Sequence, residues 1–206
     1  MSYVQFGCGH DAPESWLNFD TSPTIILERL PVFGKIYSKN DARFPANVRR
    51  GNIVKGLPVA MHSASGVYCS HTLEHLALEE FRTALRQTKA MLKPGGYFRL
   101  VVPDLAYSIG RYNDSDSPTA AHQFLEETML GRHTRPRGLG ALLKQWLGGS
   151  EHYWMWDYPA MAHELNEAGF VEIRRAAFGD SPDPRFSEVE AESRWTDCLG
   201  VECRAP

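Results

Sequence analysis

The stretch from Gly66 to Asp104 constrains the fold of this chain more than any other part of the sequence. It contains a short β-prone run at 67–69, apolar residues at helical spacing over 73–92 and a second β-prone run at 97–102. A Pro-Gly-Gly sequence predicts the end of the helix, because glycine takes the left-handed C-terminal position and proline cannot continue a helix. Two strands joined by one helix through short turns are parallel, with a right-handed crossover. The stretch therefore predicts a doubly wound α/β sheet, in which ligands bind outside the carboxyl ends of the strands.

The beginning of the chain predicts two further strands of this sheet. The first runs from Tyr3 to Phe6 and is followed by Gly-Cys-Gly, a turn that lets the backbone approach a ligand closely. The second runs from Leu17 to Asp20, whose carboxylate could accept hydrogen bonds from both hydroxyls of a ribose. A turn aspartate that caps the next residues is the equal alternative. The third glycine of the dinucleotide fingerprint and its long helix are missing, which argues against a dinucleotide-binding oxidoreductase.

The remaining segments predict a third strand, an insert and a closing hairpin. A short strand over 51–54 would carry Asn52, whose amide could meet a purine edge. Residues 105–150 predict a helical and loop insert that faces the substrate, because loops at strand ends carry specificity. Its arginines could bind an anionic acceptor or could simply keep a surface loop soluble; they are Arg132, Arg135 and Arg137. Strands over 170–178 and 198–203 predict a β-hairpin at one sheet edge.

The aromatic segment 152–158 admits three interpretations. It could be a hydrophobic plug that packs the insert on the sheet, an aromatic wall for a substrate, or a segment that presents His152 or Asp157 as an acid or base. The plug is the favoured interpretation.

Composition narrows the class of protein and its partners. With 206 residues, 43% apolar and 23% charged, we expect a single domain over 1–206. The net charge of −3 gives no footprint for nucleic acid, and no apolar run approaches the roughly 18 residues of a membrane span. The first residues lack a basic start and an apolar signal core, which favours a cytoplasmic location. The four cysteines show no paired spacing, so neither disulfides nor a resident metal is expected. Nothing in the sequence indicates the oligomeric state.

Several motifs, taken in order, resemble those of the class I S-adenosylmethionine-dependent methyltransferases, and most closely the broad type-11 group. They are the Gly7-Cys8-Gly9 turn, Asp20, Asn52 with the following Leu-Pro, and the sequences YCSHTLEHL, LKPGG and LVVPD. The resemblance covers nearly the whole chain and is weakest over 105–150. It implies a Rossmann-like sheet of seven strands with an antiparallel last strand, and methyl transfer from S-adenosylmethionine with S-adenosylhomocysteine as product.

The resemblance also implies where the cofactor binds. Gly7, Cys8 and Gly9 would lie against its methionine part, and Asp20 would bind the ribose of its adenosine. The residue that ends strand three would lie beside the adenine. The family commonly has aspartate there, whereas this chain has Asn52, which keeps the hydrogen-bonding capacity but loses the charge.

The strand that ends at Cys69 supplies the next pocket residues and the first candidate base. Ser70 and His71 would line the pocket. Alignment of the acceptor with the methyl–sulfur axis supplies much of the acceleration, and a base helps when the acceptor is a hydroxyl. His71 is the first candidate base because an imidazole titrates near neutral pH; His152 and Asp104 are the next. The alternative for His71 is a structural residue that hydrogen-bonds a neighbouring loop.

Two other classes of function fit parts of the sequence. His71, Glu74 and His75 have the H-x-x-E-H spacing of zinc hydrolases, in which two histidines on one helix face bind the metal. Their place at a strand-to-helix junction in a parallel βαβ unit argues against that class. A methyltransferase-like module that binds partners without catalysis is the second alternative, and the retained glycines and Asp20 argue against it. The acceptor itself is expected to be a small or sugar-like molecule with an oxygen or nitrogen nucleophile, and an anionic group would suit the arginine loop.

Overall fold

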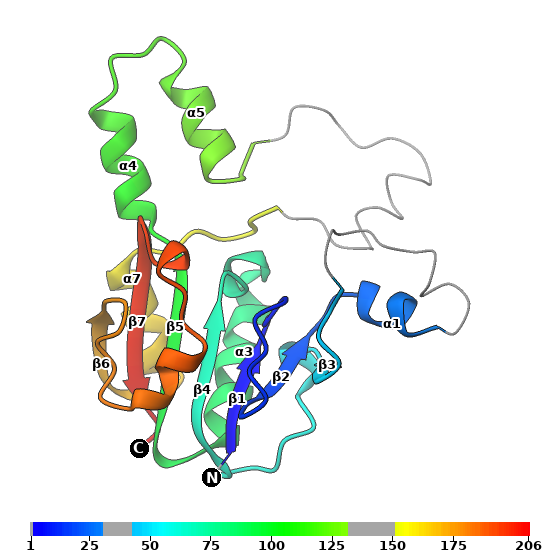
Figure 1. The fold of residues 1–206 in the computed structure, drawn as a ribbon. Coiled ribbons are helices and arrows are strands. Elements are labelled where there is room, and N and C mark those ends of the chain that lie inside the picture. Colours follow the sequence, from blue (N-terminus) through cyan, green and yellow to red (C-terminus); the bar gives the residue numbers. More distant parts are fainter. Residues whose placement is uncertain (1, 31–42, 132–150) are drawn as a thin grey trace.

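The computed structural model describes residues 2–30, 43–131 and 151–206. Within them a single seven-stranded sheet has the order β3-β2-β1-β4-β5-β7-β6 (Figure 1). Neighbouring strands are parallel from β3 to β5, whereas β7 is antiparallel to both β5 and β6. The strands are β1 (Ser2–Phe6), β2 (Leu17–Asp20), β3 (Val48–Arg50), β4 (Ala64–Ser70), β5 (Leu92–Pro103), β6 (Val171–Ala176) and β7 (Cys198–Arg204). The expected class of fold, including the antiparallel C-terminal hairpin, is confirmed.

Helices and short 3-10 turns connect these strands. The α-helices are α1 (Thr24–Arg29), α3 (Leu78–Met91), α4 (Leu105–Asn113), α5 (Ala120–Glu127) and α7 (Tyr158–Glu167). The 3-10 turns are η1 (Ile53–Lys55), η2 (Leu73–His75), η3 (Pro184–Glu188) and η4 (Glu192–Arg194). None of the helices in the described ranges is long and apolar enough to cross a membrane.

The two faces of the sheet are covered differently. Side chains alternate between the faces with the two-residue period of a strand. Val67 and Cys69 of β4 therefore belong to the larger core, to which α3 and α7 contribute. Tyr68, between them, packs on the opposite face with Phe186 and Trp195. That second face is covered by the connection between β6 and β7, drawn in orange in Figure 1.

Three expected element boundaries were wrong for local reasons. The helix predicted over 73–92 begins only at Leu78, because the residues after β4 form η2. The Pro-Gly-Gly sequence lies inside β5, since Leu92 already pairs with Ala64. The third strand ends at Arg50 rather than covering 51–54. Asn52 instead caps η1, where its side chain accepts a hydrogen bond from the Val54 N–H.

The insert after β5 is described in part. Helices α4 and α5 form a pair that stands above the sheet in Figure 1, joined by an ion pair of 3.1 Å between Arg111 and Glu127. The rest of the insert, including the arginines Arg132, Arg135 and Arg137, lies outside the described residues.

A buried arginine ties β5 to the β6–β7 connection. The Arg99 side chain is 0% exposed and forms ion pairs with Asp180 at 2.9 Å, with Glu202 at 3.2 Å and with Glu190. Its guanidinium also lies 4.5 Å from the ring centre of Trp195. Burial of a charge is tolerated only when it is paired in this way, so the cluster holds the second face of the sheet together.

Candidate functional site

The glycine turn after β1 is held against the end of β2 by Asp20. The Gly9 N–H donates to Asp20 Oδ2 at 3.0 Å, and the Ser22 N–H donates to Asp20 Oδ1 at 2.8 Å. Each carboxylate oxygen has two lone pairs, so each keeps capacity for one more donor. The two motifs that the sequence places eleven residues apart therefore form one polar site at the carboxyl ends of neighbouring strands.

The two glycines of this turn have different surroundings. Gly7 and Gly9 both have a left-handed φ, of 65° and 56°. A Cβ on Gly7 would lie 1.9 Å from Thr72 Oγ1, so this glycine is required by packing against the residues that follow β4. A Cβ on Gly9 would meet no atom of the described residues within 4 Å. The backbone at Gly9 is thus open to a ligand.

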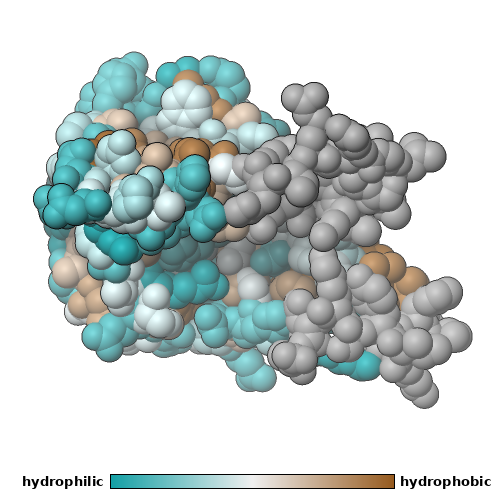
Figure 2. Space-filling model, turned by 90° about the horizontal axis from the view of Figure 1, so that it is seen from above, coloured by the Kyte–Doolittle hydropathy of each residue, from teal (hydrophilic) through white to brown (hydrophobic). Residues whose placement is uncertain are grey.

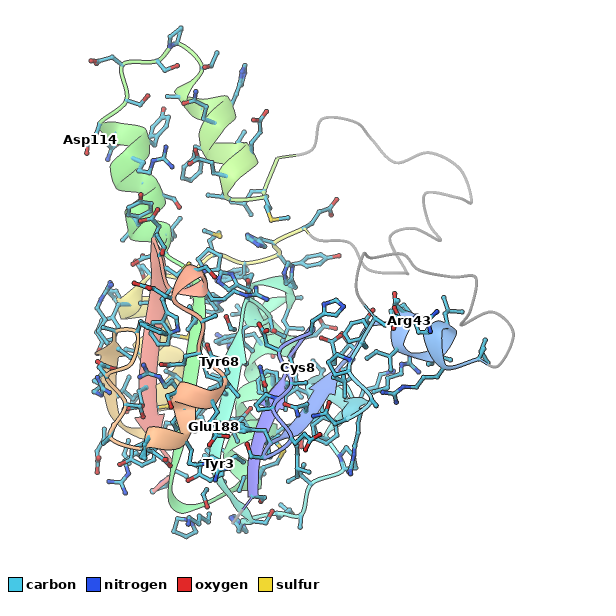
Figure 3. The ribbon with its side chains drawn as sticks, in the orientation of Figure 1. Tyr3, Cys8, Arg43, Tyr68, Asp114 and Glu188 are labelled. Atoms are coloured by element: carbon cyan, nitrogen blue, oxygen red, sulfur yellow. The ribbon has the colours of Figure 1, made fainter. Side chains whose placement is uncertain are left out.

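The Cys8 side chain, between the glycines, is buried. It packs in a small apolar cluster with Ile25 and Val48, and Figure 3 labels it near the end of β1. Burial, helped by the nearby Asp20 carboxylate, raises the pKa of its thiol to about 12. We therefore expect Cys8 to contribute its backbone, and not a thiolate, to a bound ligand.

Two other predicted cofactor residues, Asn52 and Ser70, make no contact with the Gly9–Asp20 pair in the hydrogen bonds described. Asn52 lies two residues beyond β3, and its Oδ1 accepts the Val54 N–H at 2.8 Å, which leaves its amide N–H groups as donors. Ser70 ends β4, and its buried Oγ interacts with the Tyr68 hydroxyl, two residues earlier on the same face. A buried hydroxyl usually has such a partner, so the structure favours neither Asn52 nor Ser70 as a ligand contact.

His71 is held by contacts on both ring nitrogens. Its Nε2 lies 3.0 Å from the Arg194 carbonyl and 3.8 Å from Cys198 Sγ, and its Nδ1 lies 3.5 Å from Glu74 Oε1. Burial lowers the pKa of His71, but the contacts with Cys198, Glu74 and Arg194 outweigh that effect and raise the pKa to about 10. A protonated imidazole cannot accept a proton, so these contacts favour the structural alternative over the base.

Both carboxylate oxygens of Asp104, at the end of β5, accept hydrogen bonds. Its Oδ1 accepts the Ala106 N–H at 2.9 Å and caps α4, while its Oδ2 accepts Arg175 Nη1 at 3.2 Å. The Leu105 N–H donates to the Trp156 carbonyl at 2.9 Å, which docks the segment before α7 at the strand end. These contacts favour a positioning role for Asp104.

His152 lies in a histidine–carboxylate cluster that sequence spacing alone does not reveal. One ligand atom each from Glu74, His75 and His152 lie within 4.8 Å of one another. Burial lowers the pKa of His152, and the Glu74 carboxylate opposes that effect. The H-x-x-E-H spacing points to two of the three residues, but His152 joins them only through the path of the chain before α7.

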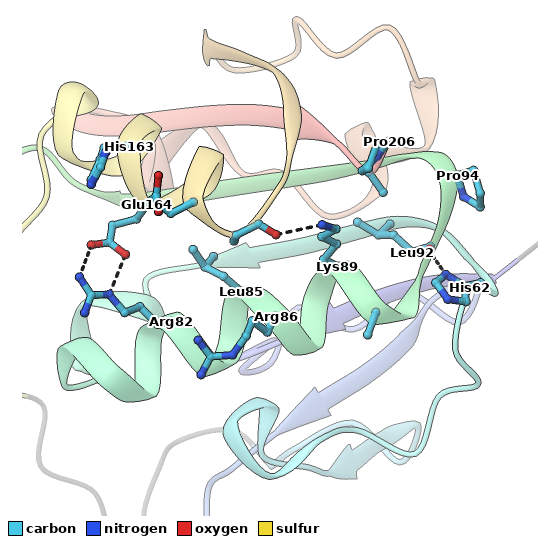
Figure 4. Close-up of a pocket in the computed structure, with 14 residues that line it drawn as sticks. His62, Arg82, Leu85, Arg86, Lys89, Leu92, Pro94, His163, Glu164 and Pro206 are labelled. Carbon is cyan, nitrogen blue, oxygen red and sulfur yellow. Dashed lines mark hydrogen bonds and ion pairs between the residues drawn. The ribbon is translucent and has the colours of Figure 1, made fainter.

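A groove of about 770 Å³ lies apart from these residues, between α3 and α7 (Figure 4). Its walls carry the ion pair of Arg82 with Glu164 at 2.8 Å and the Lys89 ammonium, which donates to the Ala168 carbonyl at 3.1 Å. None of the predicted cofactor or catalytic residues lines it. It therefore does not enter the candidate site.

A family model described as a methyltransferase domain matches residues 1–174, which is most of the chain. The chain belongs to this methyltransferase family. The resemblance to class I S-adenosylmethionine-dependent methyltransferases is thereby confirmed, as is the class of enzyme. Comparison with curated proteins found no match.

Solved methyltransferases share the fold of this one. A methyltransferase of Thermotoga maritima, described as a possible histamine N-methyltransferase, gives a TM-score of 0.54 at 14% identity, covering 100% of this chain and 82% of that chain. One from Archaeoglobus fulgidus gives 0.51 at 14% identity, covering 98% and 85%. PigF, solved with S-adenosylhomocysteine, gives 0.50 at 16% identity, covering 98% and 50%. At these identities the similarity establishes the fold alone.

The methyl donor of this family is S-adenosylmethionine, and two features of the methyltransferase fit it. The space beside Gly9 is open where the backbone turns, and each Asp20 oxygen retains a lone pair beside that space. Ribose hydroxyls are donors that such carboxylate oxygens can accept, and a backbone without a side chain lets a ligand approach closely.

The contrast between the two glycines gives a first prediction. Gly7→Ala should destabilise the fold by about 2–4 kcal/mol, because the left-handed φ and the clash with Thr72 add. Gly9→Ala should cost only about 1–2 kcal/mol of stability, but should weaken S-adenosylhomocysteine binding roughly tenfold or more, because its methyl group enters the open space. Thermal unfolding and calorimetric titration measure the two effects. Unchanged affinity in Gly9→Ala would place the cofactor away from the turn.

Proposed function

We propose that this methyltransferase transfers the methyl group of S-adenosylmethionine to an oxygen or nitrogen of a small-molecule acceptor at the carboxyl ends of β4 and β5. Binding of the methyl donor is supported by the Asp20 carboxylate. The Gly9 and Ser22 N–H groups fix this carboxylate beside the open space at Gly9. The proposed cofactor residues are those of the strand ends: Gly7, Cys8, Gly9, Asp20, Asn52, Ser70 and His71.

The proposed binding place of the methyl acceptor is supported by the aromatic segment that precedes α7. Trp156 is buried and stacks on Phe81 with ring centres 4.1 Å apart, so this part of the segment is a plug. Tyr153 and Trp154, next to it, are 56% and 41% exposed. Seen from the carboxyl ends of the strands, apolar patches lie among hydrophilic side chains (Figure 2). Exposed rings of this kind suit a planar or sugar-like acceptor, so the proposal assigns the plug to Trp156 and the substrate wall to Tyr153 and Trp154.

Methyl transfer depends mainly on the alignment of the acceptor atom with the methyl group. S-adenosylmethionine supplies an electrophilic methyl group on a positively charged sulfur. The chain must hold the acceptor atom in line with it, and such orientation can contribute about 7–11 kcal/mol. His71 and Asp104 are committed to structural contacts, so their proposed role is to position the loops around the site. His152 is the remaining candidate on the acceptor side.

A fractionated labelling experiment tests this function. The purified chain is incubated with S-adenosylmethionine labelled in its methyl group and with a cell extract divided into small-molecule and macromolecular fractions. We expect label to enter the small-molecule fraction, and Asp20→Ala to abolish that transfer. Label in protein or nucleic acid would overturn the acceptor class. Cofactor binding without label in either fraction would favour the non-catalytic binding module.

A further inference from the structure

We propose that Glu74, His75 and His152 bind a divalent transition-metal cation. One carboxylate oxygen and one nitrogen from each histidine lie within 4.8 Å of one another. Three ligands that bind one ion at 2.0–2.2 Å are necessarily within about 4.4 Å of each other. The three side chains therefore need only small rotations to close on an ion.

The carboxylate of Glu74 gives the strongest reason to infer an ion. Its side chain is 1% exposed, and neither oxygen accepts a hydrogen bond from the described residues. The nearest basic nitrogens, His71 Nδ1 at 3.5 Å and His75 Nε2 at 4.0 Å, both face Oε1 as loose ion pairs, and Oε2 has no partner among the described residues. The charge of this buried carboxylate is therefore only partly compensated, and a buried charge is unfavourable unless it is fully paired or coordinates a metal. A cation between Glu74 and the histidines would satisfy it.

His75 is held in the tautomer that a metal ligand needs. Its Nδ1 lies 2.9 Å from the Glu151 carbonyl, and a carbonyl can only accept, so Nδ1 carries the proton. The lone pair is then on Nε2, the atom that faces Glu74. Metal-binding histidines are oriented in the same way, by donating their other ring N–H to a carbonyl or carboxylate. With its side chain 32% exposed, His75 also leaves the cluster accessible.

His152 is brought to the cluster by backbone hydrogen bonds. The N–H groups of Tyr153 and Trp154 both donate to the Glu74 carbonyl, at 2.8 and 3.1 Å. The rings of His75 and His152 meet edge to face with centres 5.0 Å apart. His152 Nδ1 is buried and has no hydrogen-bond partner in the part of the chain that the structure describes. A further polar atom without a hydrogen-bond partner thus lies in the same cluster, next to Glu74.

The ligand set selects the kind of metal. Two imidazoles and one carboxylate suit Zn²⁺, Co²⁺, Fe²⁺ or Mn²⁺, whereas Mg²⁺ and Ca²⁺ prefer oxygen ligands throughout. Three protein ligands leave at least one coordination position for water or an acceptor oxygen. This set differs from the H-x-x-E-H set, because His71 lies outside the group of three and its Nε2 contacts the Arg194 carbonyl.

The site deepens the proposed function, on which its role in transfer rests. Glu74 follows Thr72, which packs on Gly7 of the cofactor turn, and His152 precedes the exposed aromatic residues. A cation here would bind the acceptor hydroxyl and lower its pKa. His152 would then act as a metal ligand and not as the base.

Metal binding to the chelator-treated whole chain tests the site. We expect calorimetry with Zn²⁺ and visible absorption with Co²⁺ to show one saturable site. Glu74→Gln and His152→Ala should each weaken it at least about 100-fold. His163→Ala, an exposed histidine on α7, is the matched control and should bind as the parent does. Thermal unfolding checks each variant, and His152, which is only partly buried on a connecting segment, keeps that variant informative if Glu74→Gln fails to fold.

The contrary outcomes are separable. Absence of saturable binding by the parent chain, or unchanged binding in His152→Ala, would overturn the proposed ligand set. Loss in His71→Ala with retention in His152→Ala would assign the metal to the H-x-x-E-H set. Parallel titration with S-adenosylhomocysteine keeps the two proposals distinct: cofactor binding without metal binding refutes the metal site alone, and metal binding without cofactor binding refutes the methyl-transfer proposal alone.

Discussion

Replacing Asp20 by alanine is expected to weaken S-adenosylhomocysteine binding by roughly 100-fold or more. Each charge-assisted hydrogen bond to a ribose hydroxyl is worth about 1.5–3 kcal/mol, and every 1.4 kcal/mol is a factor of ten. The loss extends beyond these bonds, because Asp20 also fixes the turn through the Gly9 N–H. Calorimetric titration of the purified variant measures the change.

Matched variants separate the lost ribose contact from the lost turn contact. Asp20→Asn keeps one acceptor oxygen and should retain part of the affinity. Asp11→Asn removes a nearby exposed carboxylate and should leave binding unchanged. Equal affinity in Asp20→Ala and the parent chain would disprove the placement of the ribose.

Replacing Arg99 by methionine is expected to give the largest loss of stability. Asp180, Glu190 and Glu202 would lose a shared partner whose side chain is 0% exposed. Removing one member of a buried ion cluster costs about 3–5 kcal/mol, which lowers the unfolding temperature of a chain of this length by roughly 6–20 °C. Differential scanning calorimetry at neutral pH measures it.

Arg174→Met is the control for that experiment. Arg174 contacts Asp180 and Glu202 at 2.6 Å each, but its side chain is 39% exposed. Ion pairs in contact with water contribute about 0–1 kcal/mol. If both variants lost the same stability, burial would not be the reason that Arg99 matters.

The sequence predicted the scaffold better than the local turns. The strand around Val67 and the one around Leu100 were found because runs of β-prone residues bounded by turn residues are a strong local signal. The start of α3 was misplaced because apolar spacing continues through η2, where the chain turns to meet the segment before α7. The third strand was misplaced because Asn52 bonds its own backbone two residues on, a local preference that competes with a strand.

Part of the candidate site could also be predicted from the sequence, and part of it could not. Gly9 and Asp20 could be paired in advance because parallel strands that are neighbours in sequence end at one edge of the sheet. Glu74 and His152 could not, because their contact depends on the path of the chain over the strand ends, which no periodicity encodes. The insert arginines lie outside the described residues, and their role remains a prediction.

The position of β7 determines when the sheet can be completed during synthesis. β6 pairs only with β7 among the described strands, and β7 also covers the edge of β5, from Tyr97 opposite Arg204 to Pro103 opposite Cys198. A ribosome makes these strands in the order β5, β6, β7, so β5 has an open edge while about a hundred further residues are added. Such late, distant pairings fold slowly and expose the edge to other chains. A chain truncated before Cys198 should therefore aggregate through β5, even though β1 to β4 and the turns that follow them are already made.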